Sequence, residues 1–160
     1  MPTPRLKEFL DSHKIHYETQ THPKAFTSQG VAAALHVRGR EFAKAVIVKT
    51  DAGRMVMAVV PGPRHVDLDA VKELIGARDV SLAREDEFAG RFPGCELGAE
   101  PPFGNLYDMP VYVDETLTRD AEIVFNAGSH VETIRMKYED YVSLVHPVVA
   151  KVSHATNAPG

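Results

Sequence analysis

The sequence predicts a single α/β domain in which a mixed, mostly antiparallel sheet of about seven strands is flanked by helices. The chain has 160 residues, which is within the usual range of one domain and enough to bury a core. Its composition is 44% hydrophobic and 25% charged, as is typical of a globular protein. Segments with the two-residue period of strands alternate along the chain with segments of helical period.

Apolar spacing and turn residues place each element. Helices are expected at 5–15, 30–37, 71–77, 84–92 and 137–145, with Asp67 or Asp69 starting the third. Strands are expected at 16–23, 42–50, 55–62, 80–83, 109–117, 121–128 and 131–138. A Gly-containing turn joins the two β-branched runs at 42–50 and 55–62, so these strands are expected to form a central hairpin.

No linker or internal repeat divides the chain, so residues 1–151 are expected to form one domain and 152–160 a flexible tail. The N-terminus has no apolar run of signal-peptide length, and no run is long enough to cross a bilayer as a helix. The single cysteine, Cys95, cannot form an internal disulfide. These features predict a cytoplasmic protein without membrane contact.

The charge balance excludes a protein that coats nucleic acid. There are 18 lysines and arginines against 22 aspartates and glutamates, a net charge of −4, so any RNA contact has to be local. The sequence has neither a dinucleotide-binding glycine motif nor a P-loop, and its histidines lack the spacing of a structural zinc site. No metal or cofactor is expected.

Lys44 lies between apolar residues of a predicted strand. If the strand is regular, it shares one face with Phe42, Val46 and Val48. An ammonium there either reaches the edge of the sheet or meets an anion, because burying it unpaired is costly. The pattern alone leaves both interpretations open.

The segment Gly98 to Gly104 is rich in glycine and proline. Glycine allows close approach of the backbone to a ligand and proline fixes dihedral angles, so the loop could aim amide groups at a reacting carbonyl. An ordinary turn-rich connection is the alternative. Cys95, just before this loop, could be a nucleophile, but a lone cysteine is more commonly a small packing residue.

The segment Phe125 to His130, FNAGSH, is typical of a hairpin tip, with Ser129 and His130 at the start of the next strand. Histidine is the side chain best suited to exchange protons near neutral pH, so His130 is a candidate functional residue.

Taken in order, these motifs resemble the YbaK/prolyl-tRNA-synthetase-associated family. The resemblance covers nearly the whole chain: THPKAFTS, AKAVIVK, GAEPP followed by FG, FNAGSH-x-E-T-I-R and a last helix around YEDY. It implies a trans-editing deacylase that removes a wrongly attached amino acid from tRNA, without metal or covalent intermediate and with help from a hydroxyl of the terminal adenosine.

The resemblance also implies the site residues. The catalytic set would be Lys44, Gly98, Ala99, Glu100, Pro101 and Pro102. The substrate-binding set would be His130, Ser129, Gly128, Asn126, Phe103, Gly104, Phe26 and Thr27. A small apolar chamber is expected around Phe26, Val46, Ala58 and Phe103, with Ala, Ser, Thr or Cys as the amino acid removed.

Aminoacyl-tRNA is the expected partner, with a synthetase or elongation factor as a second one, and a monomer is favoured. The alternative is a non-catalytic module on the same fold that binds tRNA, a nucleotide, a small ligand or a partner protein. Its motivation is the acidic net charge and the lack of conventional catalytic groups.

Overall fold

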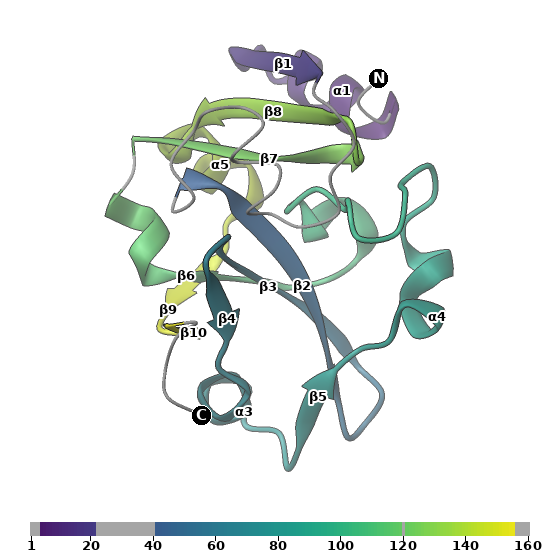
Figure 1. Cartoon of the computed structure of the whole chain (residues 1–160), viewed down its shortest axis with the longest axis vertical. Helices are drawn as coiled ribbons and strands as arrows, with labels where there is room; N and C mark the ends of the chain where they lie inside the picture. Colours follow the sequence, from purple (N-terminus) through teal and green to yellow (C-terminus); the bar gives the residue numbers. More distant parts are fainter. Residues whose placement is uncertain (1–3, 22–40, 120, 156–160) are drawn as a thin grey trace.

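A five-stranded mixed sheet lies at the centre of the structure, a computed structural model that describes residues 4–21, 41–119 and 121–155 (Figure 1). Its strands lie in the order β5 (Val80–Leu82), β2 (Ala43–Thr50), β3 (Met55–Pro61), β6 (Val111–Asp114) and β9 (Val148–Ala150). β2 is antiparallel to both β3 and β5, whereas β6 is parallel to β3 and to β9. The predicted central hairpin is therefore the middle of this sheet.

A second sheet of three antiparallel strands has the order β1 (Tyr17–Thr21), β8 (Glu132–Lys137) and β7 (Glu122–Ser129). One parallel bridge, between Phe42 and Val124, joins the start of β2 to β7. The two sheets thus meet where β2 passes beside β7 (Figure 1). A short antiparallel pair, β4 (Arg64–Val66) with β10 (Ser153–Ala155), completes the strands of the described residues.

Four α-helices flank the sheets in the described part of the chain: α1 (Pro4–Ser12), α3 (Leu68–Ile75), α4 (Glu85–Phe88) and α5 (Tyr138–Val145). α3 shows why they begin and end where they do. The Asp67 side chain accepts a hydrogen bond from the Ala70 N–H at 3.1 Å, and Gly76 ends the helix at φ 70°. Short 3-10 segments follow at Ala89–Arg91, Gly104–Tyr107 and Glu115–Arg119.

Two apolar clusters hold the fold together. The main core includes Leu6, Ile47, Phe103, Phe125 and Tyr141, and brings α1, both sheets and α5 together. The second core consists of the buried residues Val48, Val56, Ala58, Val60, Val71, Val80 and Val152. β2 serves both because its side chains alternate, so Ala43 and Ile47 enter the main core and Val48 the second.

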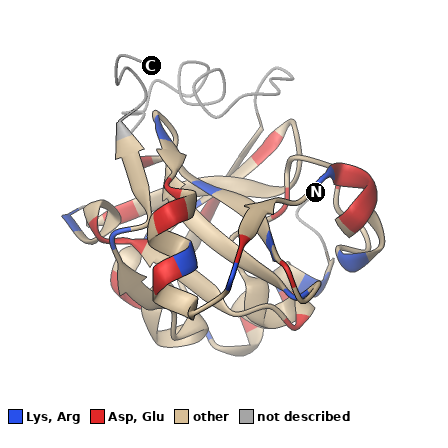
Figure 2. Cartoon of the chain, turned by 90° about the horizontal axis from the view of Figure 1, so that it is seen from below, with Lys and Arg blue, Asp and Glu red and all other residues tan. Residues whose placement is uncertain are grey.

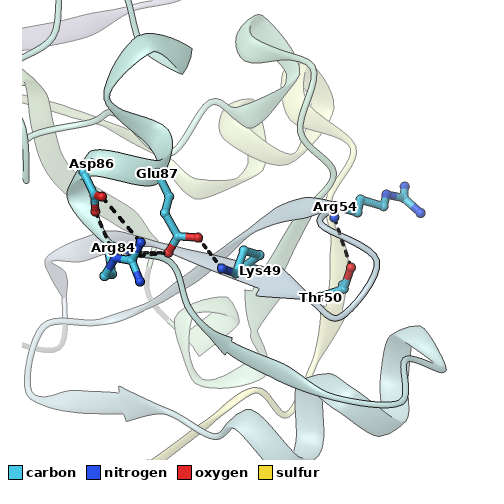
Figure 3. A network of polar contacts seen from close by, with 6 residues as sticks. All are labelled: Lys49, Thr50, Arg54, Arg84, Asp86 and Glu87. Atoms are coloured by element: carbon cyan, nitrogen blue, oxygen red, sulfur yellow. Dashed lines mark hydrogen bonds and ion pairs between the residues drawn. The ribbon is translucent and has the colours of Figure 1, made fainter.

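Residues of both charges are spread along the ribbon in Figure 2, and α4 carries three consecutive acidic residues (Glu85, Asp86 and Glu87). A network of polar contacts ties this helix to β2, because the Lys49 ammonium pairs with the Glu87 carboxylate (Figure 3). Glu87 also accepts from the Arg84 N–H at 2.9 Å. No helix in the described ranges is long and apolar enough to span a bilayer.

The expected fold class is confirmed, but its strands are shared among three sheets. The short strands β4, β9 and β10 were not predicted, because each is ordered by pairing with a strand distant in the sequence: β4 with β10, and β9 with β6. The predicted tail begins at 152, yet Val152 is fully buried and Ser153–Ala155 form β10. The helix expected at 30–37 lies outside the described residues.

Candidate active site

The candidate site lies along the edge of β7 that does not pair with β8. β8 occupies one edge of this strand. On the other, Phe42 bridges to Val124, while Gly128 donates to the Ala99 carbonyl at 3.0 Å and accepts from the Glu96 N–H at 2.8 Å. The start of β2 and the segment 96–104 therefore approach β7 on either side of one residue, Asn126.

Lys44 lies on the same face as Asn126. β7 directs Phe125 and Ala127 into the main core, and β2 directs Ala43 there. Because strand side chains alternate, Lys44 and Asn126 point to the opposite face, each two residues beyond the Phe42–Val124 bridge. The sequence pattern predicted the face of Lys44 but not its neighbour.

The Lys44 ammonium is half-buried and donates a hydrogen bond to the Gly62 carbonyl at 3.2 Å. Burial lowers the pKa of this lysine, since removal from water disfavours its charged form. The carbonyl gives the cation a fixed position at the start of β2, and no other hydrogen bond of this ammonium is seen within the described residues, so two of its three N–H donors could serve a ligand.

Internal hydrogen bonds fix the loop Gly98 to Gly104. Gly98 adopts φ +85° and donates its N–H to Glu100 Oε2 at 2.7 Å. The buried Tyr141 hydroxyl donates to the Pro102 carbonyl at 2.5 Å. A Cβ on Gly104 would lie 2.8 Å from the Met109 carbonyl oxygen, so the chain requires glycine there.

Three amides of this loop are already engaged. Besides Gly98, the Ala99 N–H donates to the Glu96 carbonyl at 3.1 Å and the Phe103 N–H to the Pro101 carbonyl at 2.7 Å. Prolines at 101 and 102 have no N–H. The loop can therefore offer a ligand its carbonyls and its shape, whereas the Gly98 amide becomes available only when the Glu100 carboxyl releases it.

Glu100 is a buried acid within this loop, with 6% of its surface exposed. Its burial raises its pKa from 4.5 to about 7, although backbone N–H groups of Gly98, Glu100 and Ala99 oppose the shift. The sequence marked Glu100 only as a member of the loop. Neither the burial nor the shifted pKa could be read from the motif.

His130 fastens the loop to the β7–β8 hairpin. Its backbone N–H donates to the Glu96 carboxylate at 2.6 Å, and its Nε2 lies 2.7 Å from the Leu97 carbonyl oxygen. A carbonyl can only accept, so Nε2 carries the proton. The ring also covers Gly98, where a Cβ would lie 3.3 Å from His130 Cε1.

The other predicted residues of this hairpin lie around an irregularity in the β7–β8 pairing, between Asn126 and Ser129. Gly128 adopts φ 101°, a conformation that favours glycine. The Ser129 hydroxyl accepts from the Val131 N–H at 3.4 Å. The Asn126 side-chain oxygen is buried and has no hydrogen-bond partner among the residues that the structure describes.

Phe103 supports the loop from within the main core. It is fully buried, and its ring centroid lies 5.4 Å from that of Phe125 and 5.3 Å from that of Tyr141. Of the residues expected to line an apolar chamber, Phe103 packs in the main core, whereas Val46 and Ala58 pack in the second core. Phe26 and Thr27 lie outside the described residues.

Cys95 is a poor nucleophile in this setting. The thiol is half-buried, which raises its pKa, and its Sγ lies 3.6 Å from the Tyr107 hydroxyl. Within the described ranges no three histidines, cysteines or acidic residues are grouped to hold a metal ion.

Two supporting residues were not singled out from the sequence. Glu96 bonds both Gly128 and His130, and Tyr141 holds the Pro102 carbonyl. Tyr141 lies within the YEDY segment that carried part of the resemblance, whereas nothing in the pattern around Glu96 distinguished it.

Comparisons with known proteins identify the family of the chain. The aminoacyl-tRNA editing domain family matches residues 22–144. The multifunctional Ser/Thr-tRNA deacylase ProXp-y of Escherichia coli strain K12 is 27% identical over 147 residues, covering 89% of this chain and 87% of the relative. A proline–tRNA ligase of Bacillus subtilis strain 168 is 32% identical over 110 residues, which are 68% of this chain and 19% of the ligase.

Among solved structures, a candidate trans-editing enzyme for prolyl tRNA synthetase superposes with a TM-score of 0.82 over 94% of this chain and 96% of that one, at 22% identity. That likeness establishes the shared fold. The match to the family extends over most of the chain and includes Lys44, the loop Gly98 to Gly104 and His130. The chain is therefore a member of the aminoacyl-tRNA editing domain family.

Proposed function

We propose that this chain is a trans-editing deacylase that hydrolyses the ester between a small amino acid and its tRNA. The observation that carries the proposal is the approach of β2 and the loop 96–104 to β7 on either side of Asn126, with Lys44 on the same face of β2 as Asn126 on β7. Membership of the editing family supports the reaction class.

In the proposed reaction, water adds to the ester carbonyl carbon and the bond to the ribose oxygen breaks. The ribose oxygen leaves as a hydroxyl after taking a proton, and the free amino acid is released. Lys44 would use its remaining N–H donors on the phosphate or ester oxygens at the tRNA end, where a fixed positive charge stabilises developing negative charge.

The loop Gly98 to Pro102 would supply positioning rather than acid–base chemistry. It is held at Leu97 by His130 and at Pro102 by Tyr141, so its carbonyls have fixed directions. Oriented contacts of this kind can hold a water molecule in line with the ester carbonyl. Glu100 stabilises the turn through the Gly98 N–H, and His130 shapes the pocket.

Alanine, serine, threonine and cysteine are the proposed amino acids. One methylene changes binding by only about 1 to 3 kcal/mol, so a synthetase admits small intruders and a second site that hydrolyses them raises fidelity. The match to a Ser/Thr-tRNA deacylase supports this size class. A synthetase or elongation factor would supply the tRNA selection, because this chain has a net charge of −4.

The test is a panel of tRNAs charged with Ala, Ser, Thr, Cys or Pro, incubated with the protein and with Lys44→Ala. We expect one or more small aminoacyl-tRNAs to be hydrolysed, and Lys44→Ala to reduce the rate by about 100-fold, as for the loss of one charge-stabilising group. Lys49→Ala is the matched control, since Lys49 lies on the same strand but pairs with Glu87. Equal rates for Lys44→Ala and the protein would refute the role of Lys44.

A further inference from the structure

Asn126 contains an unsatisfied acceptor. Its Oδ1 is buried and has no hydrogen-bond partner, a condition shared within the described part of the chain only by the Tyr138 hydroxyl. Folded proteins rarely leave a buried polar atom unpaired, because it loses its bonds to water and gains nothing in return. Such an atom at a site is well suited to a ligand that completes the bond.

The position of Asn126 is as informative as its missing partner. It lies between the Phe42–Val124 bridge and the bonds of Gly128 to the loop 96–104. Its side chain faces away from the main core, as Lys44 does on β2. The acceptor oxygen of Asn126 therefore lies between the two segments that are proposed to hold the reacting ester.

The charge near Asn126 restricts which ligand groups can donate a hydrogen bond to it. Lys44 already places one ammonium on this face, and burial disfavours its charge. A second full positive charge on the same face would be repelled by this ammonium. A carboxamide is itself neutral, so a neutral N–H or O–H is the donor that Asn126 can accept without adding charge.

We propose that the Asn126 carboxamide accepts a hydrogen bond from a neutral donor next to the scissile ester, and so selects aminoacyl-ribose esters and fixes their orientation. This inference rests on the proposed function. Two groups of the substrate have this chemistry: the α-amino group in its neutral form, and the ribose hydroxyl beside the ester. Asn126 thereby becomes a specificity-determining residue for the reaction.

The experiment compares Asn126→Ala and the nearly isosteric Asn126→Leu with Asn105→Ala, a control at an exposed asparagine in the segment Gly104–Tyr107. Hydrolysis is measured on alanyl- and seryl-tRNA. Binding is measured by calorimetry with 3′-alanylamino-3′-deoxyadenosine, which has an amide in place of the ester. Two further analogues lack either the 2′-hydroxyl or the α-amino group.

We expect both Asn126 variants to bind the amide analogue about 10- to 100-fold more weakly, with an equal fall in kcat/KM, and Asn105→Ala to match the unmodified protein. One of the two shortened analogues lacks the group that donates to Asn126. The unmodified protein should bind this analogue as weakly as the Asn126 variants bind the full analogue. The variants should bind this analogue and the full analogue with equal affinity. Their melting temperatures should be unchanged or raised, because the Oδ1 atom of Asn126 has no partner to lose among the described residues.

The inference is overturned if either variant binds the full analogue within twofold of the unmodified protein. It is also overturned if the loss of affinity from the Asn126 substitution and the loss from removing either donor multiply when they are combined. Such independence would show that Asn126 binds neither group. Hydrolysis without this coupling would leave the proposed function standing. Coupling without hydrolysis would retain the role of Asn126 and refute the deacylase.

Discussion

Replacing Glu100 by glutamine should change how the stability of the protein depends on pH. Glu100 is 6% exposed, and burial raises its pKa from 4.5 to about 7. Glutamine has the same size and keeps an oxygen that can accept from the Gly98 N–H, so the loop geometry should persist. The substitution removes only the ability to ionise.

The sign and size follow from proton linkage. A carboxyl whose pKa is raised on folding binds more protons in the folded than in the unfolded state between pH 4.5 and about 7, so stability falls as pH rises through this window. At 1.36 kcal/mol per pKa unit, Glu100 should cost the protein about 2 to 3 kcal/mol of unfolding free energy between pH 5 and pH 8. Glu100→Gln should lack this loss.

The assay is urea denaturation of both proteins at pH 5, 6, 7 and 8, with unfolding monitored by circular dichroism. The difference in unfolding free energy, Glu100→Gln minus unmodified protein, should rise with pH by about 2 to 3 kcal/mol. Glu8→Gln, at an exposed position of α1, controls for loss of a carboxylate elsewhere. Parallel curves for Glu100→Gln and the unmodified protein would refute the claim that burial governs Glu100.

Two further substitutions test the support of the loop. Tyr141→Phe leaves the Pro102 carbonyl without its donor, and should cost about 1 to 3 kcal/mol of unfolding free energy in urea; no loss would mean that water or another group replaces the hydroxyl. Gly104→Ala places a Cβ 2.8 Å from the Met109 carbonyl oxygen and 2.7 Å from Val111 Cγ2, so thermal unfolding should show a destabilisation of about 2 kcal/mol. An unchanged melting temperature would show that the segment shifts freely.

Much of the fold could be predicted because its signals are local. The apolar runs on either side of a glycine turn give the hairpin of β2 and β3, and Asp67 and Gly76 mark the two ends of α3. The missed strands β4, β9 and β10 are three residues each. β10 is ordered by pairing with β4, about 90 residues earlier in the chain, where Arg64 Nε donates to Ser153 Oγ at 2.6 Å.

The candidate site divides in the same way. Lys44, the loop Gly98 to Gly104 and His130 stand out in the sequence because a lysine among apolar residues, a cluster of glycine and proline, and a histidine at a turn are each unusual. Their roles were assigned by resemblance to a family, and membership of that family is confirmed. The supporting contacts of Glu96 and Tyr141 had no comparable local signal.

By itself, the sequence determined the fold class, the hairpin, the face of Lys44 and the segments that identify the editing family. Only the tertiary structure showed that the buried Asn126 oxygen, between β2 and the loop, has no partner among the described residues, that Glu100 is buried, and that the amides of Gly98, Ala99 and Phe103 are already bonded. The physical reason is that burial and hydrogen-bond satisfaction depend on residues distant in the chain, whereas periodicity and turn chemistry depend on neighbours.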